Sequence, residues 1–134
     1  MAVLISDPIG DFINRLMNAG AVKHKTLSVP FSSFKLAVAE KLKEAGYLET
    51  VEKKGKKVQK TLDVVLKYDT TGSHVIKGVK RVSKPGRRMY KNVNEIFPVR
   101  YGKGALILST PKGVKTDKEA RKEKVGGEAL FEIW

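Results

Sequence analysis

Residues 47–68 read YLETVEKKGKKVQKTLDVVLKY, and within them the spacing of apolar residues changes from helical to strand-like. Leu62, Val64, Leu66 and Tyr68 alternate with Thr61, Asp63 and Lys67, as expected of a strand with one buried face. The tight basic loop Lys53–Lys57 interrupts the pattern before this strand begins. The segment therefore predicts a β-hairpin with one buried face, whose strands lie at 47–52 and 60–68.

A helix is expected near the start of the chain, from Asp7 to Gly20. Asp7 can accept hydrogen bonds from the first backbone amides, and Pro8 has no amide to leave unpaired. Gly20 is placed to end the helix. Apolar residues recur between these ends at the spacing of one helical face: Ile9, Phe12, Ile13, Leu16 and Met17.

A strand and a second helix separate this helix from the hairpin. The strand is predicted at 22–29, ended by Pro30. Ser32 or Ser33 can then cap a helix that Gly46 ends, with an apolar face formed by Phe34, Val38, Leu42 and Ala45. Two helices and three strands in this order predict an α/β lobe with two helices on a three-stranded sheet.

The segment Asp69–Ser73 is small and polar, and it is the best linker candidate in the chain. We therefore predict an N-terminal lobe at 1–70 and a C-terminal lobe at 71–134. The C-terminal lobe is expected to be mostly β, with strands at 75–82, 89–91, 105–109 and 129–134. Thr116 and Glu119 have capping-box spacing, which predicts one short helix at 117–124 ended by Gly126-Gly127. The fold class is therefore α+β, in two small lobes.

The stretch Val75–Lys91 carries seven Lys or Arg side chains and no acidic residue. Lys84, Arg87 and Arg88 flank a Pro85-Gly86 turn that can direct them outward. The whole chain agrees, since 27 Lys and Arg against 14 Asp and Glu give a formal net charge of +13 over 134 residues. This balance favours nucleic acid over a membrane, which would require a basic amphipathic helix or a lipid anchor.

Residues that could carry catalysis are scarce. The chain has no cysteine, and its two histidines, His24 and His74, both fit solvent-exposed positions better than a general base. No carboxylates or histidines show the spacing of a metal site. The first six residues, MAVLIS, are too short for a signal-peptide core, and no apolar run approaches a membrane span. We expect a cytoplasmic protein with no metal, cofactor, small-molecule substrate or membrane partner, and no enzymatic activity.

Two short motifs could contact nucleic acid. In Ser109-Thr110-Pro111-Lys112-Gly113-Val114, the hydroxyls can reach a base edge, a ribose or a phosphate, although an ordinary turn explains them equally well. In Gly126-Gly127-Glu128, the glycines are a helix stop by default, but bare backbone also lets RNA approach and Glu128 can accept a hydrogen bond. Tyr90 could stack on a base or belong to the core. The lysine-rich hairpin loop carries no specific signal.

These motifs, taken in order, resemble the bacterial form of the family of small-subunit ribosomal protein eight. Any one of them is weak, but their order and spacing span nearly the whole chain. They are Asp7-Pro8 with Asp11, Arg15 and Asn18-Ala19, then Arg81–Gly86, Ser109-Thr110 with Lys112-Gly113-Val114, Thr116-Asp117, Glu119-Ala120, Gly126-Gly127-Glu128 and the final Trp134.

The resemblance implies a structural protein that binds the central domain of small-subunit ribosomal RNA and helps that domain assemble beside neighbouring ribosomal proteins. It also implies repression of translation through the messenger RNA of its own operon, as in many bacteria. The main RNA contacts that it implies are Ser109, Thr110, Lys112, Gly113, Gly127 and Glu128, joined by Tyr90, by the turn Ser83, Lys84, Pro85 and Gly86, and by Arg88. The secondary contacts are Asp7, Arg15 and Asn18. A non-specific DNA-compacting protein and a metal-dependent nuclease are the alternatives from other classes.

Overall fold

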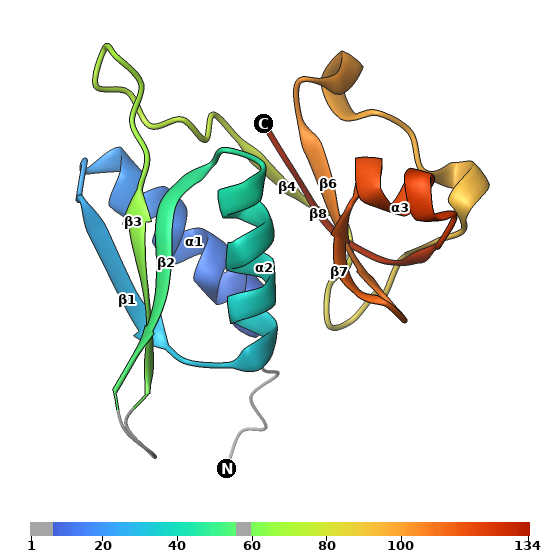
Figure 1. Cartoon of the computed structure of the whole chain (residues 1–134), viewed down its shortest axis with the longest axis horizontal. Helices are drawn as coiled ribbons and strands as arrows, with labels where there is room; N and C mark the ends of the chain where they lie inside the picture. Colours follow the sequence, from blue (N-terminus) through green and yellow to red (C-terminus); the bar gives the residue numbers. More distant parts are fainter. Residues whose placement is uncertain (1–6, 56–59) are drawn as a thin grey trace. The chain divides into compact units, whose positions relative to one another are not determined.

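The computed structural model describes residues 7–55 and 60–134, so the start MAVLIS and the tip of the basic hairpin loop lie outside it. The chain divides into two compact units, each with its own antiparallel sheet. One unit is Phe12–Lys77, and the other joins Gly78–Trp134 to the residues up to Asp11. The expected α+β class is confirmed (Figure 1).

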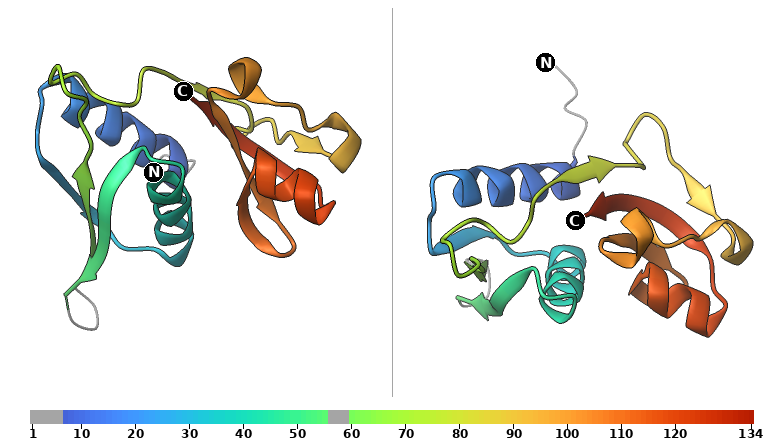
Figure 2. Two further views of the ribbon diagram at one scale, coloured as in Figure 1. Left: turned by 45° about the horizontal axis from the view of Figure 1, so that its top comes forward. Right: turned by 90° about the horizontal axis from the view of Figure 1, so that it is seen from above.

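The unit Phe12–Lys77 packs two helices against a three-stranded sheet. The sheet order is β1-β3-β2, and Figure 2 shows both helices on one side of it. The predicted alternation is confirmed, since Leu62 and Val64 are fully buried. The elements are α1 (Pro8–Ala21), whose first turn belongs to the other unit, β1 (Thr26–Pro30), α2 (Ser33–Glu44), β2 (Leu48–Lys54) and β3 (Thr61–Leu66).

The predicted helix starts are correct, and the predicted details after them hold only in part. Asp7 accepts a hydrogen bond from the amide of Gly10 (3.2 Å), and Ser32 accepts one from the amide of Lys35 (3.0 Å). Gly20 does not end α1, because it lies inside the helix, where a side chain would collide with the ring of His74. In α2, Phe34 is 38% exposed, so the buried face is narrower than predicted. The remaining differences are that Ala45 is exposed and that β1 begins at Thr26 instead of residue 22.

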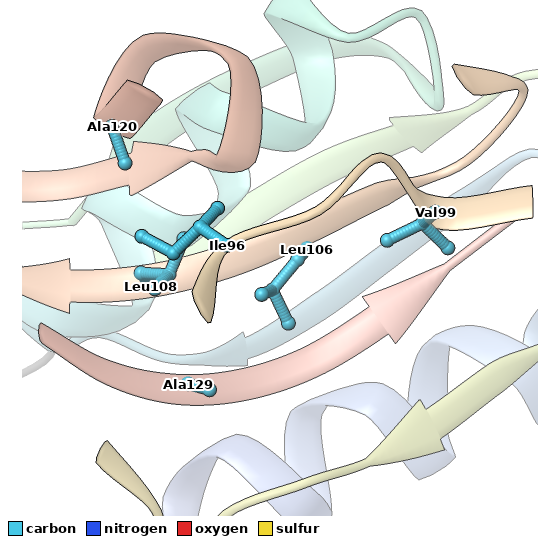
Figure 3. Close-up of a cluster of buried hydrophobic side chains, with 6 residues drawn as sticks. All are labelled: Ile96, Val99, Leu106, Leu108, Ala120 and Ala129. Atoms are coloured by element: carbon cyan, nitrogen blue, oxygen red, sulfur yellow. The ribbon is translucent and has the colours of Figure 1, made fainter. Parts of the chain in front are cut away.

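The second unit is a five-stranded sheet with one short helix. Four strands run in the order β4-β8-β6-β7, and β5 also pairs with β8. Buried side chains from the sheet, from α3 and from the segment before β6 form its core cluster: Ile96, Val99, Leu106, Leu108, Ala120 and Ala129 (Figure 3). The elements are β4 (Val79–Arg81), β5 (Tyr90–Lys91), β6 (Ala105–Thr110), β7 (Gly113–Thr116), α3 (Asp117–Glu123) and β8 (Gly127–Ile133), with 3-10 turns at Val93–Glu95 and Val99–Gly102.

Three expectations for this unit need correction. The strand predicted at 75–82 shortens to β4, and β7 was not predicted at all. The capping box of Thr116 and Glu119 is confirmed, but α3 ends at Lys124, whose φ of 56° is left-handed, and not at the two glycines. Instead, a side chain at Gly126 would lie 2.4 Å from the carbonyl oxygen of Lys91, and one at Gly127 would lie 2.2 Å from that of Ser109. The glycines are therefore required where three strand backbones approach one another.

The candidate linker Asp69–Ser73 is an ordered turn. The Asp69 carboxylate accepts hydrogen bonds from the amide of Thr71 (2.9 Å) and the amide of Ser73 (3.0 Å). Tyr68 and His74 then form an antiparallel bridge across the turn. The turn therefore joins residues of one unit instead of linking the two. The compact units divide after Lys77, and the predicted lobe boundary at 70/71 stays a prediction.

Candidate nucleic-acid interface

Three candidate residues from three strands lie side by side in the second sheet. Tyr90 of β5 pairs with Glu128 of β8, and Glu128 pairs with Ser109 of β6. Directly opposed residues of antiparallel strands place their side chains on the same face, so the three side chains form one row. We call Tyr90, Glu128 and Ser109 the polar row.

The polar row presents groups that are available for an outside partner. Tyr90 is 68% exposed, so its side chain does not belong to the hydrophobic core. Ser109 is half-buried, and no described residue hydrogen-bonds to its hydroxyl. Glu128 uses only its Oε2 atom within the described chain, so Oε1 can accept a further hydrogen bond.

A buried serine holds Glu128 in place. The hydroxyl of Ser83 donates to Oε2 of Glu128 (2.5 Å) and accepts from the amide of Met89 (3.2 Å). Arg88 donates to the same Oε2 atom (3.2 Å). Since Ser83 is only 2% exposed, its contribution is to orient the carboxylate and not to touch a ligand.

The turn that follows Ser109 is self-contained. The Thr110 hydroxyl donates to the carbonyl of Gly113 (2.7 Å) and accepts from the amide of Lys112 (3.1 Å). Gly113 has a φ of +105°, which favours glycine, and it starts β7. Thr110 is buried, and its hydroxyl is used within an ordinary turn. Lys112, in the same turn, is exposed.

The basic segment forms the tight bend that Pro85-Gly86 predicts. Lys84 and Arg87 exchange two backbone hydrogen bonds of 2.9 Å, which closes a two-residue turn. Lys84, Gly86, Arg87 and Arg88 are all exposed. The bend thus carries two cations, Lys84 and Arg87, next to Ser83 and Arg88, the residues that hold Glu128.

The predicted secondary contacts are not brought together as a set. The Asp7 carboxylate is occupied, because Arg81 donates two hydrogen bonds to it (2.8 and 3.1 Å) and Gly10 donates a third. The hydrogen bonds from Arg81 are the main reason that the pKa of Asp7 lies below its usual value. Arg15 and Asn18 are exposed and lie three residues apart on α1, in the other unit.

Some residues beside the polar row escaped the sequence analysis. An open hollow of about 590 Å³ adjoins Tyr90 and Gly127 and brings two further lysines to this edge, Lys91 and Lys124. Asn92 and Glu95 form a second capping box at its wall. Arg81 was noted only as part of a motif, and its contacts were not predicted: it donates to the carbonyl of Ser83 (2.9 Å) and pairs with Asp7. The spacing of Asn92 and Glu95 was a usable signal, but nothing local indicates the partner of Arg81.

The histidines take no part in this region. His24 is exposed, as expected, but His74 is half-buried, so the expectation for His74 was wrong. Burial is the main cause of its lowered pKa, with a smaller contribution from the charge of Lys77. Among residues 7–55 and 60–134, no three His, Asp or Glu residues are grouped to hold a metal ion. Within the same ranges, no helix combines the length and apolarity needed to span a bilayer.

Comparison with known proteins gives full-length matches. The family model of ribosomal protein S8 matches residues 7–134. The chain is 48% identical to the small ribosomal subunit protein uS8 of Exiguobacterium sibiricum over 132 residues, which cover 98% of this chain and all of the relative. It is 48% identical to the uS8 protein of Mycoplasma mobile over 134 residues, the whole of both chains. It is 45% identical to that of Streptococcus pneumoniae over 132 residues, 98% of this chain and all of the relative.

Proposed function

The chain belongs to the ribosomal protein S8 family, and on this premise we propose that it binds the central domain of ribosomal RNA as a structural constituent of the small ribosomal subunit. Its place is then in the cytoplasmic ribosome, among neighbouring small-subunit proteins. Its relatives are structural ribosomal proteins, and the chain is not an enzyme. A second target, the messenger RNA of its own operon, belongs to the same proposal.

One observation supports the polar row as the RNA-binding surface. In the polar row, an unpaired hydroxyl, a carboxylate oxygen and an exposed aromatic ring meet on neighbouring strands. Ser109 can donate to a base edge or a ribose, and Glu128 can accept from a base amino group or a 2′-hydroxyl. Tyr90 offers a face for stacking on an unstacked base.

The cations around the row supply the remaining binding free energy. Lys84, Arg87 and Lys112 are exposed on the two turns next to it, and phosphates neutralised by such residues release counterions. These contacts are independent of base sequence, whereas the polar row can distinguish nucleotides. Regular duplex RNA hides its base edges in a deep, narrow groove, so the row suits an irregular part of a helix with splayed bases.

The roles of the remaining candidates differ in kind. Ser83 orients Glu128, Gly127 lets the strands approach, and Gly113 shapes the turn beside Thr110. Asp7 acts through its pair with Arg81. The contacts proposed for RNA are therefore Ser109, Glu128, Tyr90, Lys112, Lys84 and Arg88, with Arg15 and Asn18 as a second set on α1.

Competition binding with two variants tests this proposal. The full chain binds a central-domain RNA fragment, and unrelated RNA hairpins and duplex DNA of equal length compete at near-physiological salt. We expect Ser109→Ala to weaken binding to the cognate fragment about tenfold and to leave unrelated RNA unaffected, because one base-edge contact contributes about 1–3 kcal/mol. Lys84→Ala should weaken binding to both RNAs alike.

Ser28→Ala is the matched control, since Ser28 is an exposed strand serine of the other unit whose hydroxyl donates to Asp63. It should bind both RNAs as the wild type does. Equal losses on both RNAs for Ser109→Ala would contradict the specific role of the polar row. Equal competition by RNA and duplex DNA would favour a non-specific DNA-compacting protein instead.

A further inference from the structure

A second basic surface lies in the same unit and shares no residue with the polar row. It is an open hollow of about 630 Å³, lined by Pro98, Arg100, Gly102, Lys118 and Arg121. Arg100 and Gly102 come from the 3-10 turn before β6, Pro98 precedes that turn, and the other two residues come from α3. We call this set the basic hollow.

Its two arginines are held in place by partners that lie behind them. The Arg100 guanidinium lies 3.8 Å from the centre of the Trp134 ring. Arg121 donates to Oδ2 of Asp117 (2.9 Å), a carboxylate that is buried and also accepts from the amide of Leu106. A guanidinium stacked on a ring keeps its N–H edge free, in the planar geometry that matches a phosphate.

Only one of the three cations of the basic hollow, Arg121, is neutralised from within the described chain. Arg100 and Lys118 are exposed, and neither forms an ion pair with any described residue. Asp117 is occupied by Arg121, and no lining residue is acidic. Arg100 and Lys118 therefore leave two positive charges uncompensated on a concave surface that is lined by no acidic residue, and this raises the local concentration of anionic partners.

An exposed aromatic ring stands next to the hollow in the sequence. Phe97 precedes Pro98 and is 68% exposed, the same fraction as Tyr90. The other large exposed apolar side chains among the described residues, Val22 and Phe34, belong to the other unit. An aromatic ring beside arginines is the combination that binds single-stranded or unpaired RNA, where bases stack and phosphates pair.

We propose that the basic hollow is a second RNA-binding surface, which takes the phosphates of an RNA strand on Arg100, Lys118 and Arg121 and stacks an unpaired base on Phe97. This inference rests on the proposed function, because it assumes that the ligand is RNA. An acidic segment of a neighbouring protein would also satisfy the charge. The exposed ring of Phe97 favours a nucleotide, since an unpaired base can stack on it and a peptide carboxylate cannot.

Two RNAs of different length separate this surface from the polar row. The short RNA carries only the fragment that binds the polar row, and the long RNA is the whole central domain. We expect the double variant Arg100→Gln/Lys118→Gln to bind the long RNA about tenfold more weakly, with a salt slope reduced by about two, and to bind the short RNA as the wild type does. Neither change removes the partner of Asp117, so the buried carboxylate keeps its ion pair.

Lys43→Gln is the control, since Lys43 is an exposed lysine on α2 that lies outside the basic stretch Val75–Lys91 and does not line the hollow. It should leave binding to both RNAs unchanged. Unchanged binding of the long RNA by the double variant would overturn the second surface. A tenfold loss on the short RNA as well would also overturn it, because the cations would then act as general charge.

A photoreactive benzoylphenylalanine at position 97 identifies the partner directly in the assembled small subunit. A cross-link to ribosomal RNA supports the proposal, with position 22 of the other unit, 63% exposed, as the comparison. A cross-link to a neighbouring protein alone would overturn the proposal and identify an acidic peptide, instead of RNA, as the ligand of the basic hollow. Failure of the proposed function would give a different result, because Ser109→Ala would then bind the short and the long RNA as the wild type does.

Discussion

One carboxylate of the first unit and two of the second are held in contrasting ways. Asp69, in the first unit, takes its hydrogen bonds from Thr71 and Ser73, which are two and four residues away in the sequence. In the second unit, Asp7 pairs with Arg81 across 74 residues, and Glu128 accepts from Ser83 across 45. The first arrangement can form as a local turn, whereas the second exists only after distant segments have met.

This difference bears on function. The polar row takes one residue from each of three strands, and the Ser83 hydroxyl, from a fourth segment, holds Glu128. A recognition surface built in this way keeps its geometry only while the whole unit is folded. The first unit can lose a local turn without moving such a row.

The glycine at the start of β8 should give the largest effect. The methyl group of Gly127→Ala would lie 2.2 Å from the carbonyl oxygen of Ser109. The backbone of β6 cannot move away from it without breaking the pairing of β6 and β8. We expect a loss of about 3 kcal/mol in the free energy of unfolding of the second unit. Urea unfolding followed by the fluorescence of Trp134, the only tryptophan, measures it.

Gly86→Ala is the control for this change, because nothing lies within 4 Å of a side chain at Gly86 and its φ is not left-handed. Its free energy of unfolding should stay within about 0.5 kcal/mol of the wild type. If Gly127→Ala were equally harmless, the close approach of the strands would not be what requires glycine there.

Ser83→Ala should give the next largest effect. The change removes the hydroxyl that accepts from Met89 and donates to Glu128, at a site that is only 2% exposed. Leaving a buried amide without its acceptor costs about 2 kcal/mol. Urea unfolding followed by circular dichroism, which reports both units, measures this loss. Ser28→Ala, which removes an exposed hydroxyl of the first unit, should cost less than about 0.5 kcal/mol. Equal costs for the two serines would remove the contrast between the units.

Local sequence chemistry predicted most of the elements correctly. The caps at Asp7 and Ser32, the capping box of Thr116 and the Pro85-Gly86 bend all depend on residues within about four positions of one another. The same local reasoning misjudged Gly20 and Gly127. Both glycines fit a helix end, but each is required by a contact with a residue far along the chain, His74 or Ser109.

The candidate site was predictable in its members but not in its arrangement. Ser109, Glu128 and Tyr90 were each indicated by a motif, but their register depends on a strand irregularity between Ile107 and Leu108 that no spacing rule reveals. Likewise, the pattern around Thr110 could not tell which of two adjacent hydroxyls is used within the turn. The basic hollow was missed altogether, because the stacking of Arg100 on Trp134 joins positions 34 residues apart.

Asp7→Asn should give a smaller effect than either change above. Asparagine keeps the helix cap, so the change removes only the charge pair with Arg81. Because 36% of the Asp7 side chain is exposed, solvent screens the pair, and we expect a loss of about 1 kcal/mol. Since the folded pKa of Asp7 lies below 3.8, this stabilisation is present above that pH and is lost as the pH falls through the folded pKa.

Urea unfolding at pH 7 and at pH 3 measures this effect, and the gap between wild type and Asp7→Asn should narrow at pH 3. The comparison is Asp69→Asn. Its turn lowers the pKa of Asp69 to about 2, chiefly through the hydrogen bond from Thr71, so its contribution is lost between about pH 4 and pH 2. Because Asp69 lies in the first unit, Asp69→Asn should leave the unfolding transition that Trp134 fluorescence reports unchanged. A parallel change in Trp134 would mean that the two units unfold as one.

The smallest effect is expected from His74, in the first unit. Its Nε2 atom is buried without a hydrogen-bond partner among the described residues, and its ring fills the space that Gly20 leaves open on α1. Burial and the nearby charge of Lys77 lower its pKa below 6.5. The unfolded chain therefore binds a proton at a higher pH than the folded chain, and stability falls as the pH falls from about 6.5.

His74→Gln should remove this dependence between pH 7 and pH 5, a window in which carboxylates with pKa values lowered below 3.8, Asp7, Asp63 and Asp69, do not titrate. Hydrogen exchange of the α1 amides is the measurement, because α1 carries Gly20 and the fluorescence of Trp134 reports the other unit. The exposed His24 is the control, and His24→Gln should keep the slope of the wild type. A slope that persists in His74→Gln but vanishes in His24→Gln would show that the exposed histidine, and not the buried one, makes this unit sensitive to pH.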